Sequence, residues 1–194
     1  MLKNALLTLL ALAIAFGLGG GSVWYALDAQ SGVGAIRSGP WTAFPDAGTK
    51  AADPYTKARI ARNGVLSLGR AEGMAFVADA DSSGARLRRE CAYAIEGRFP
   101  AARFFTLYAA DASIDPIDTG KPRRAALHSY QLLRKADGTT LIQTGNQPLP
   151  GNWLPVTGTG PLYFVVTFYD TPIATSSGFF DASLPGIRRV ACNA

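Results

Sequence analysis

The sequence predicts a mainly β protein: an antiparallel β-sandwich, jelly-roll-like, with one short helix before the sheet and a transmembrane helix at the N-terminus. Seven short segments show the apolar runs, or the alternation of apolar and polar residues, that are typical of strands. The 21 glycines and 12 prolines supply the many turns that such a fold requires. A chain of 194 residues fits one domain plus a targeting segment.

The N-terminal segment carries no charged residue over positions 5–27. With a rise of about 1.5 Å per residue, a helix of this length spans roughly 35 Å and can cross a bilayer. Lys3 precedes the segment and Asp28 follows it, so we expect a cytoplasmic N-terminus and a periplasmic C-terminal domain. This pattern predicts a single-pass protein of the bacterial inner membrane.

A cleaved signal peptide is the alternative to this anchor. Residues 5–18 have the length of a signal peptide's apolar region, and Gly19 and Gly21 are small enough for a cleavage site. Apolar sequence resumes at residues 23–27, which favours the uncleaved anchor. The expected organisation is an anchor or signal segment over residues 1–27, a linker over 28–52 and the sandwich over 53–194.

The first expected element of the domain is a short helix. Asp53 can cap its free amides, and Pro54 fits its first turn. Residues 55–62 form its body, and Asn63-Gly64 supplies a left-handed stop.

The strands of the sandwich are expected after this helix. Asp137-Gly138 is the clearest hairpin signal, and the long apolar run at 162–169 predicts a central strand. The predicted strands cover residues 73–78, 91–96, 103–108, 127–134, 139–144, 162–169 and 187–192.

The two cysteines, Cys91 and Cys192, both lie on predicted strands. In an oxidising envelope two cysteines usually form one disulfide, and two buried thiols are the alternative. In the chain-entropy model a bridge across so many residues stabilises the fold by up to roughly 4–5 kcal/mol.

The net charge of +5 comes from basic residues scattered among acids. A nucleic-acid binder usually gathers its cations on one face or segment, so we expect no nucleic-acid partner. A basic surface beside anionic lipid headgroups is the simpler interpretation, and a mixed solvated surface is the alternative.

The segment from Asp79 to Glu90 matches the calcium-loop template loosely. Asp79, Asp81, Ser83 and Glu90 supply oxygens at its ligand positions. The flanks are predicted strands rather than helices, and Arg88 places positive charge beside the site. We therefore favour a hairpin turn and expect no metal site and no cofactor.

The only histidine, His128, is the main candidate for acid–base chemistry. It cannot activate Ser129 directly, because adjacent strand residues point to opposite faces. Asp111, Asp115 and Asp118 share one loop with the pattern of turn residues. These features favour a non-catalytic protein.

The most unusual local sequence is residues 149–155, where two prolines and a glycine restrict the backbone around Asn152 and Trp153. A rigid loop that presents a ring and an amide suits stacking on a sugar. The alternative is that Trp153 plugs the end of the sandwich and Asn152 bonds local backbone.

The block of residues 150–155, with the strand that ends at residues 168–172, resembles the bacterial domain of unknown function 1214. Residues 103–108 resemble that family's Arg-aromatic-aromatic-Ser/Thr-x-Tyr strand, and Asp137-Gly138 its hairpin. The resemblance covers roughly residues 53–194 and implies a jelly-roll sandwich without an established activity. Many relatives carry a second domain, the domain of unknown function 1254, where this chain has its apolar segment.

We predict a membrane-anchored periplasmic domain that binds a ligand or an envelope protein. One alternative is an enzyme on a carbohydrate-like or small polar substrate; another is a structural component of an envelope complex, including a homo-oligomer. The candidate ligand contacts are Asn152, Trp153, Arg103, Tyr108, His128 and Tyr169.

Overall fold

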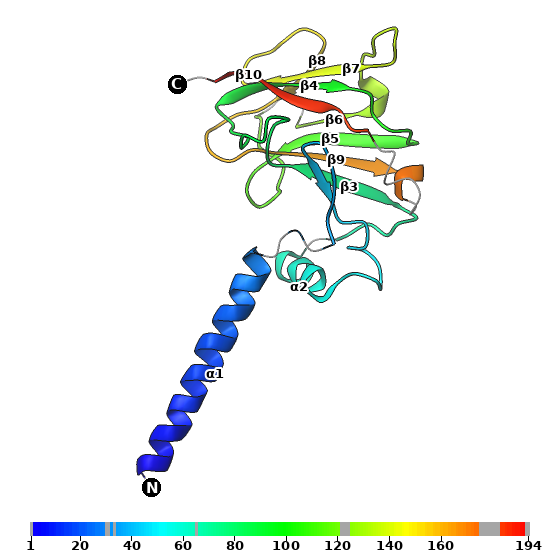
Figure 1. Cartoon of the computed structure of the whole chain (residues 1–194). Helices are drawn as coiled ribbons and strands as arrows, with labels where there is room; N and C mark the ends of the chain where they lie inside the picture. The colour runs from blue at the N-terminus through cyan, green and yellow to red at the C-terminus, as the bar shows by residue number, and fades with distance from the viewer. Residues whose placement is uncertain are drawn as a thin grey trace.

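The computed structural model describes residues 2–29, 32, 34–64, 66–120, 125–174 and 183–192. Helix α1 (Leu2–Ala29) extends away from a body rich in strands, and α2 (Pro54–Asn63) lies beside its C-terminal end (Figure 1). Two short 3₁₀ helices, η1 (Ser129–Gln131) and η2 (Pro172–Ala174), complete the described helical elements.

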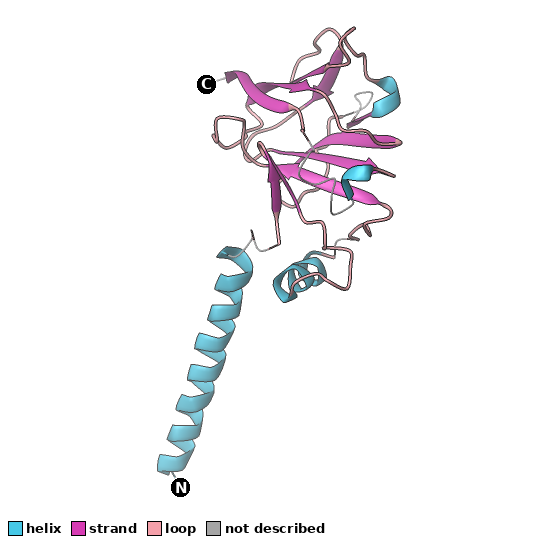
Figure 2. Ribbon diagram, turned by 45° about the vertical axis from the view of Figure 1, so that its right-hand side comes forward, coloured by secondary structure: helices cyan, strands magenta, loops and turns pink. Residues whose placement is uncertain are grey.

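The strands form two sheets, as the sequence predicts (Figure 2). The chain crosses from one sheet to the other several times along its length. Every pairing is antiparallel except the one between β7 and β8, which is parallel and departs from the wholly antiparallel prediction. The six-stranded sheet is, in order, β1 (Ile36–Ser38), β2 (Trp41–Ala43), β3 (Gly73–Ala78), β9 (Tyr163–Tyr169), β5 (Phe104–Ala110) and β6 (Ala126–His128). The four-stranded sheet is β10 (Gly186–Cys192), β4 (Cys91–Gly97), β7 (Thr140–Gly145) and β8 (Asn152–Pro155).

One apolar core joins the two sheets. Alternate residues of each strand point inward, because successive side chains of a strand lie on opposite faces. The predicted central strand is confirmed, since β9 pairs with both β3 and β5. The largest buried side chains of the core are Trp41, Tyr93, Phe76, Phe164, Phe168, Ile95, Leu107, Ile142, Leu154 and Ile187.

Helix α2 has the caps that the sequence predicts. The Asp53 carboxylate accepts hydrogen bonds from the amides of Tyr55 (2.9 Å) and Thr56 (3.0 Å). Gly64 ends the helix with a φ of 63°, a left-handed conformation that glycine adopts without strain.

The predicted linker over residues 28–52 is wrong for residues 36–43, which form β1 and β2. Strand β2 pairs with β3 in the six-stranded sheet. Trp41 is completely buried, and its indole N–H donates to the carbonyl of Pro185 at 2.7 Å. These strands have three residues each, too few for a period of two to be visible in the sequence.

The predicted strand over residues 127–134 is also wrong beyond His128, where β6 ends and η1 begins. The Asp137-Gly138 turn forms, and the Lys135 amide donates to the Thr139 carbonyl at 2.8 Å. It closes only an isolated bridge between Arg134 and Thr140. Since β6 and β7 belong to different sheets, this segment is a crossing between sheets rather than a hairpin.

Helix α1 is long and apolar enough to cross a membrane over Leu2–Leu27, and it is the one such helix in the described part of the chain. None of that window is buried against the rest of the protein. A membrane anchor and a signal sequence both have these properties.

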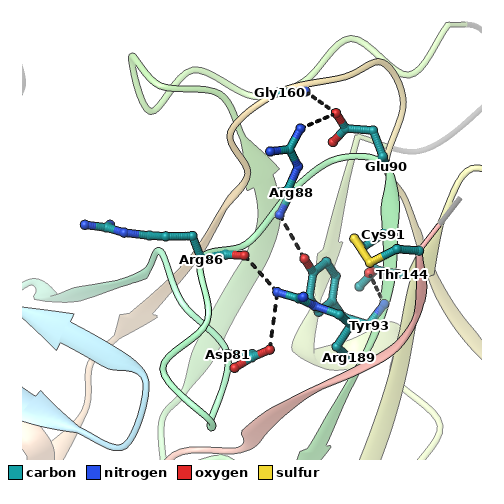
Figure 3. Close-up of a disulfide and its surroundings, with 10 residues drawn as sticks. Asp81, Arg86, Arg88, Glu90, Cys91, Tyr93, Thr144, Gly160 and Arg189 are labelled. Carbon is teal, nitrogen blue, oxygen red and sulfur yellow. Dashed lines mark hydrogen bonds and ion pairs between the residues drawn. A yellow bond between two sulfur atoms is a disulfide. The ribbon is translucent and has the colours of Figure 1, made fainter. Parts of the chain in front are cut away.

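The disulfide joins Cys91 and Cys192, as the sequence predicts. The two residues face each other across the antiparallel pair of β4 and β10. The bond therefore ties the last described strand to the centre of the four-stranded sheet (Figure 3).

Candidate ligand-binding cleft

A cleft of about 630 Å³ opens where β5, η1 and β7 begin. Because β5 belongs to one sheet and β7 to the other, the cleft lies at an end of the sandwich, between the sheets. The residues that line it are Phe99, Pro100, Ala101, Ala102, Arg103, Phe105, Ser129, Tyr130, Leu132, Arg134, Gly138 and Thr140.

The apolar part of the cleft is built from packed aromatic rings. Phe99 stacks on Phe105 with ring centroids 4.5 Å apart, and Phe105 is buried in the core. The Ser129 hydroxyl accepts a hydrogen bond from the Phe105 amide at 3.3 Å, which holds η1 against β5. These contacts give the cleft a fixed wall.

Two arginines give the cleft its charge. Arg103 lies 3.8 Å from the Asp170 carboxylate, but both side chains are largely exposed, so the pair is weak. Within the described residues, no carboxylate forms an ion pair with Arg134. The lining residues include no aspartate, glutamate or histidine. The lining residues of the cleft thus include two cations and no anion, and Asp170 lies beside one of the cations.

Asn152, a predicted ligand contact, is mostly buried, and its side chain bonds the backbone of two other segments. Its side-chain oxygen accepts from the Leu133 amide at 2.7 Å. Its amide nitrogen donates to the carbonyls of Leu133 (2.8 Å) and Leu141 (3.0 Å). These bonds agree with the alternative prediction, in which Asn152 bonds local backbone.

Trp153 points to the opposite face of β8 from Asn152, because successive strand residues alternate. Its ring is half-buried, and its indole N–H donates to the Gly145 carbonyl at 3.2 Å. Trp153 is not among the residues that line the cleft.

His128 and Tyr169 lie together on the outer face of the six-stranded sheet. They form an aromatic cluster with Phe104 and Tyr130, in which the Phe104 ring centroid is 5.6–5.9 Å from the other three. The His128 Nδ1 is buried and has no hydrogen-bond partner among the described residues. Tyr130 connects this cluster to the cleft, because it lines the cleft and its hydroxyl donates to the Arg103 carbonyl at 3.1 Å.

Tyr108 lies on the same outer face, further along β5, in a groove that also includes Tyr169. Burial raises the pKa of the Tyr108 phenol, with smaller contributions from Tyr169 and Asp115. The structure thus divides the six predicted contacts. Arg103 lines the cleft, three residues share the outer face, and Asn152 and Trp153 belong to the other sheet.

The carboxylates of the loop that resembles a calcium site bond other residues of the protein. One Asp81 oxygen accepts hydrogen bonds from Ser83 and Ala85, and the other lies 3.6 Å from Arg189 (Figure 3). Asp79 pairs with Arg86, and Glu90 with Arg88. Among the described residues, no group of three or more His, Cys, Asp or Glu side chains is placed to hold a metal ion.

Sequence reasoning did not identify Tyr130 or Arg134 as cleft residues. Both lie in the part of the predicted strand over residues 127–134 that is not a strand, and they come together only because the chain crosses between sheets there. The sequence shows that Tyr130 lies close to His128, but it does not show that the Tyr130 hydroxyl bonds the Arg103 carbonyl.

These features define a two-sheet domain with a basic cleft at one end. The chain belongs to the family described as Protein of unknown function (DUF1214), whose sequence model matches residues 72–173, more than half of the chain. No curated protein matches the sequence.

Two crystal structures are similar to this one. The VPA0106 protein from Vibrio parahaemolyticus aligns over 73% of this chain with a TM-score of 0.58 and 21% sequence identity. The alignment covers 36% of that protein, so this chain spans about a third of its length. An uncharacterized protein from Burkholderia cenocepacia aligns over 93% of this chain and 53% of its own, with a TM-score of 0.39 and 14% identity. At such identities the likeness to VPA0106 concerns the fold alone.

Proposed function

We propose that this protein is a membrane-anchored periplasmic domain that binds a small acidic, carbohydrate-like ligand in the cleft between Arg103 and Arg134. The observation that carries the proposal is the charge of the cleft: two arginines line it, and no acidic side chain does. A site with two arginines, of which only Arg103 has a carboxylate nearby, is suited to a carboxylate or phosphate.

The shape of the cleft supports a small molecule. Its volume of about 630 Å³ is within the usual range for ligand sites. Phe99 and Tyr130 offer ring faces to a sugar or another planar group, and Ser129 and Thr140 offer hydroxyls. The arginines would set the charge of the ligand, and the rings would hold its less polar face.

A binding role is favoured over catalysis by the chemistry of the lining residues. General acid–base catalysis needs a group that titrates near the working pH, usually histidine, aspartate or glutamate. The lining residues include none of these, and His128 is on the outer face of the sheet.

Anchoring through α1 is supported by its length, its exposure and the charge that precedes it. Lys3 lies at the start of the helix, before the uncharged residues 5–27, and the disulfide fits an oxidising compartment such as the periplasm. This is tested by fractionating cells and measuring the mass of the chain. We expect full-length chain in the membrane fraction, which protease degrades only when it is added from the periplasmic side. Chain that lacks residues 1–27 would show that the segment is a cleaved signal.

The ligand proposal is tested by thermal unfolding of the full chain in detergent. Glucuronate and glucose 6-phosphate should raise the melting temperature in a saturable way, whereas neutral glucose should not. The doubly substituted variant Arg103→Gln with Arg134→Gln should lose the effect. An equal response to charged and neutral sugars would contradict the proposal.

A further inference from the structure

Helix α2 lies where the candidate membrane span ends. The apolar window of α1 stops at Leu27, and α1 and α2 are in contact. Both views of the molecule place α2 beside this end of α1, with the sandwich beyond it (Figures 1 and 2). If α1 crosses the bilayer, as the proposed function holds, α2 is at the level of the lipid headgroups.

The charge of α2 is entirely positive. Its ten residues include Lys57, Arg59 and Arg62 and no acidic side chain. Lys50 adds a cation just before the helix. The neighbouring acid, Asp53, accepts hydrogen bonds from the amides of the first turn. The Thr56 side chain and, to a smaller extent, these amides lower the pKa of its carboxyl.

The cations are divided between two faces of α2. Thr56 is buried, and the Arg59 guanidinium lies 5.3 Å from the centre of the Phe44 ring, so this face packs on the domain. Tyr55, Lys57 and Arg62 are exposed.

The exposed face of α2 also suits close approach to a flat surface. Ala58 and Ala61 lie between its cations and are small and exposed. Beyond the helix, Leu66 is 96% exposed, and Tyr55 is 42% exposed. An amphipathic tyrosine and an exposed leucine beside lysine and arginine are typical of segments that lie in a membrane interface.

We infer that α2 rests in the headgroup layer of the bilayer and binds anionic phospholipid through Lys57 and Arg62. The end of α1 also fits the headgroup layer. Trp24 and Tyr25 are exposed on its last turns, and aromatic residues usually lie at this interface. A second contact at α2 would fix how the sandwich and its cleft are held relative to the membrane. The inference rests on the proposed anchoring and is independent of the proposed ligand.

Photocrosslinking of the full chain in nanodiscs tests this contact. Tyr55 is replaced by the photoreactive residue p-benzoylphenylalanine, and lipid adducts are identified by mass. With phosphatidylglycerol in the disc, adducts to that lipid should form at position 55. When Tyr130 on the sandwich is replaced in the same way, no adducts to phosphatidylglycerol should form there.

Charge variants separate lipid recognition from simple proximity. Lys57→Gln and Arg62→Gln should each reduce the phosphatidylglycerol adducts, by roughly fivefold per cation removed. Lys57→Arg should preserve them, as should Arg188→Gln in β10, at the far end of the molecule in Figure 1.

Two outcomes would overturn the inference in distinguishable ways. Chain that stays in the discs but gives no more adducts at position 55 than at position 130 would overturn the α2 contact alone. Chain that fails to enter the discs would overturn the anchoring and the contact together.

Discussion

Asn152 and Leu133 are joined by a reciprocal pair of hydrogen bonds. The Leu133 amide donates to the Asn152 side-chain oxygen at 2.7 Å, and the Asn152 amide nitrogen donates to the Leu133 carbonyl at 2.8 Å. The pairing replaces the strand that the sequence predicts at this point. It fixes the crossing segment that carries Tyr130 and Arg134 to the first residue of β8.

Replacement of Asn152 by leucine should therefore destabilise the fold. The substitution removes the side-chain partners of the Leu133 amide and of two carbonyls at a partly buried place, at a cost of about 1–2 kcal/mol. Chemical denaturation measures the loss. Asn146→Ala, at an exposed asparagine beyond β7, is the matched control and should change little. Equal stability of the two variants would show that the hydrogen bonds between Asn152 and Leu133 contribute little to stability.

Trp153→Ala should leave ligand binding intact. The residue is outside the cleft, so melting shifts caused by acidic sugars should persist. Its lost hydrogen bond to Gly145 and its half-buried ring should lower the stability by about 2 kcal/mol. Loss of the ligand response in a folded Trp153→Ala variant would instead support the loop at residues 149–155 as the site.

The Cys91–Cys192 disulfide should contribute strongly to stability. Its cysteines are 101 positions apart, and a closed loop of that size is worth about 4–5 kcal/mol in the chain-entropy model. The paired substitution Cys91→Ala with Cys192→Ala should lower the free energy of unfolding by that order, as measured by denaturant titration. Reduced wild-type protein should match the variant. No change on either treatment would refute this account of the bond.

Asp81 should make the stability depend on acid pH. Burial opposes ionisation, but hydrogen bonds from Ser83 and Ala85 and the charge of Arg189 outweigh it, so the pKa of this carboxyl is lowered. A lowered folded pKa contributes stability that is complete above the unfolded value, near about 4, and is lost as the pH falls through the folded pKa.

The stability difference between wild type and Asp81→Asn should accordingly shrink as the pH falls below about 4. Denaturant titrations of both proteins across this range measure it. Other acidic groups shift with pH in both proteins and cancel in the comparison. A difference that stays constant or grows under acid would contradict the assignment.

The regular parts of the fold followed from local sequence patterns. The caps at Asp53 and Gly64 and the strand at residues 73–78 involve neighbouring residues, so they could be predicted directly. Strands β1 and β2 could not, since each has three residues and depends on Trp41 reaching Pro185 far along the chain.

The candidate site was predictable only in part, for a related reason. Arg103 was identified by its place in a strong strand pattern. Arg134 joins it because a side chain from residue 152, rather than a neighbouring strand, holds the crossing segment in place. The turn at Asp137-Gly138 could be predicted from its two residues. That the strands before and after it belong to different sheets could not, because the sheets are assembled from the whole chain.

The most direct test of the proposed function is calorimetric titration of the full chain with glucuronate and with neutral glucose. We predict saturable binding of glucuronate that weakens with added salt, no detectable binding of glucose, and loss of the glucuronate signal when Arg134 is replaced by glutamine. A folded Arg134→Gln variant that binds glucuronate as tightly as the wild type does would contradict the assignment of the cleft.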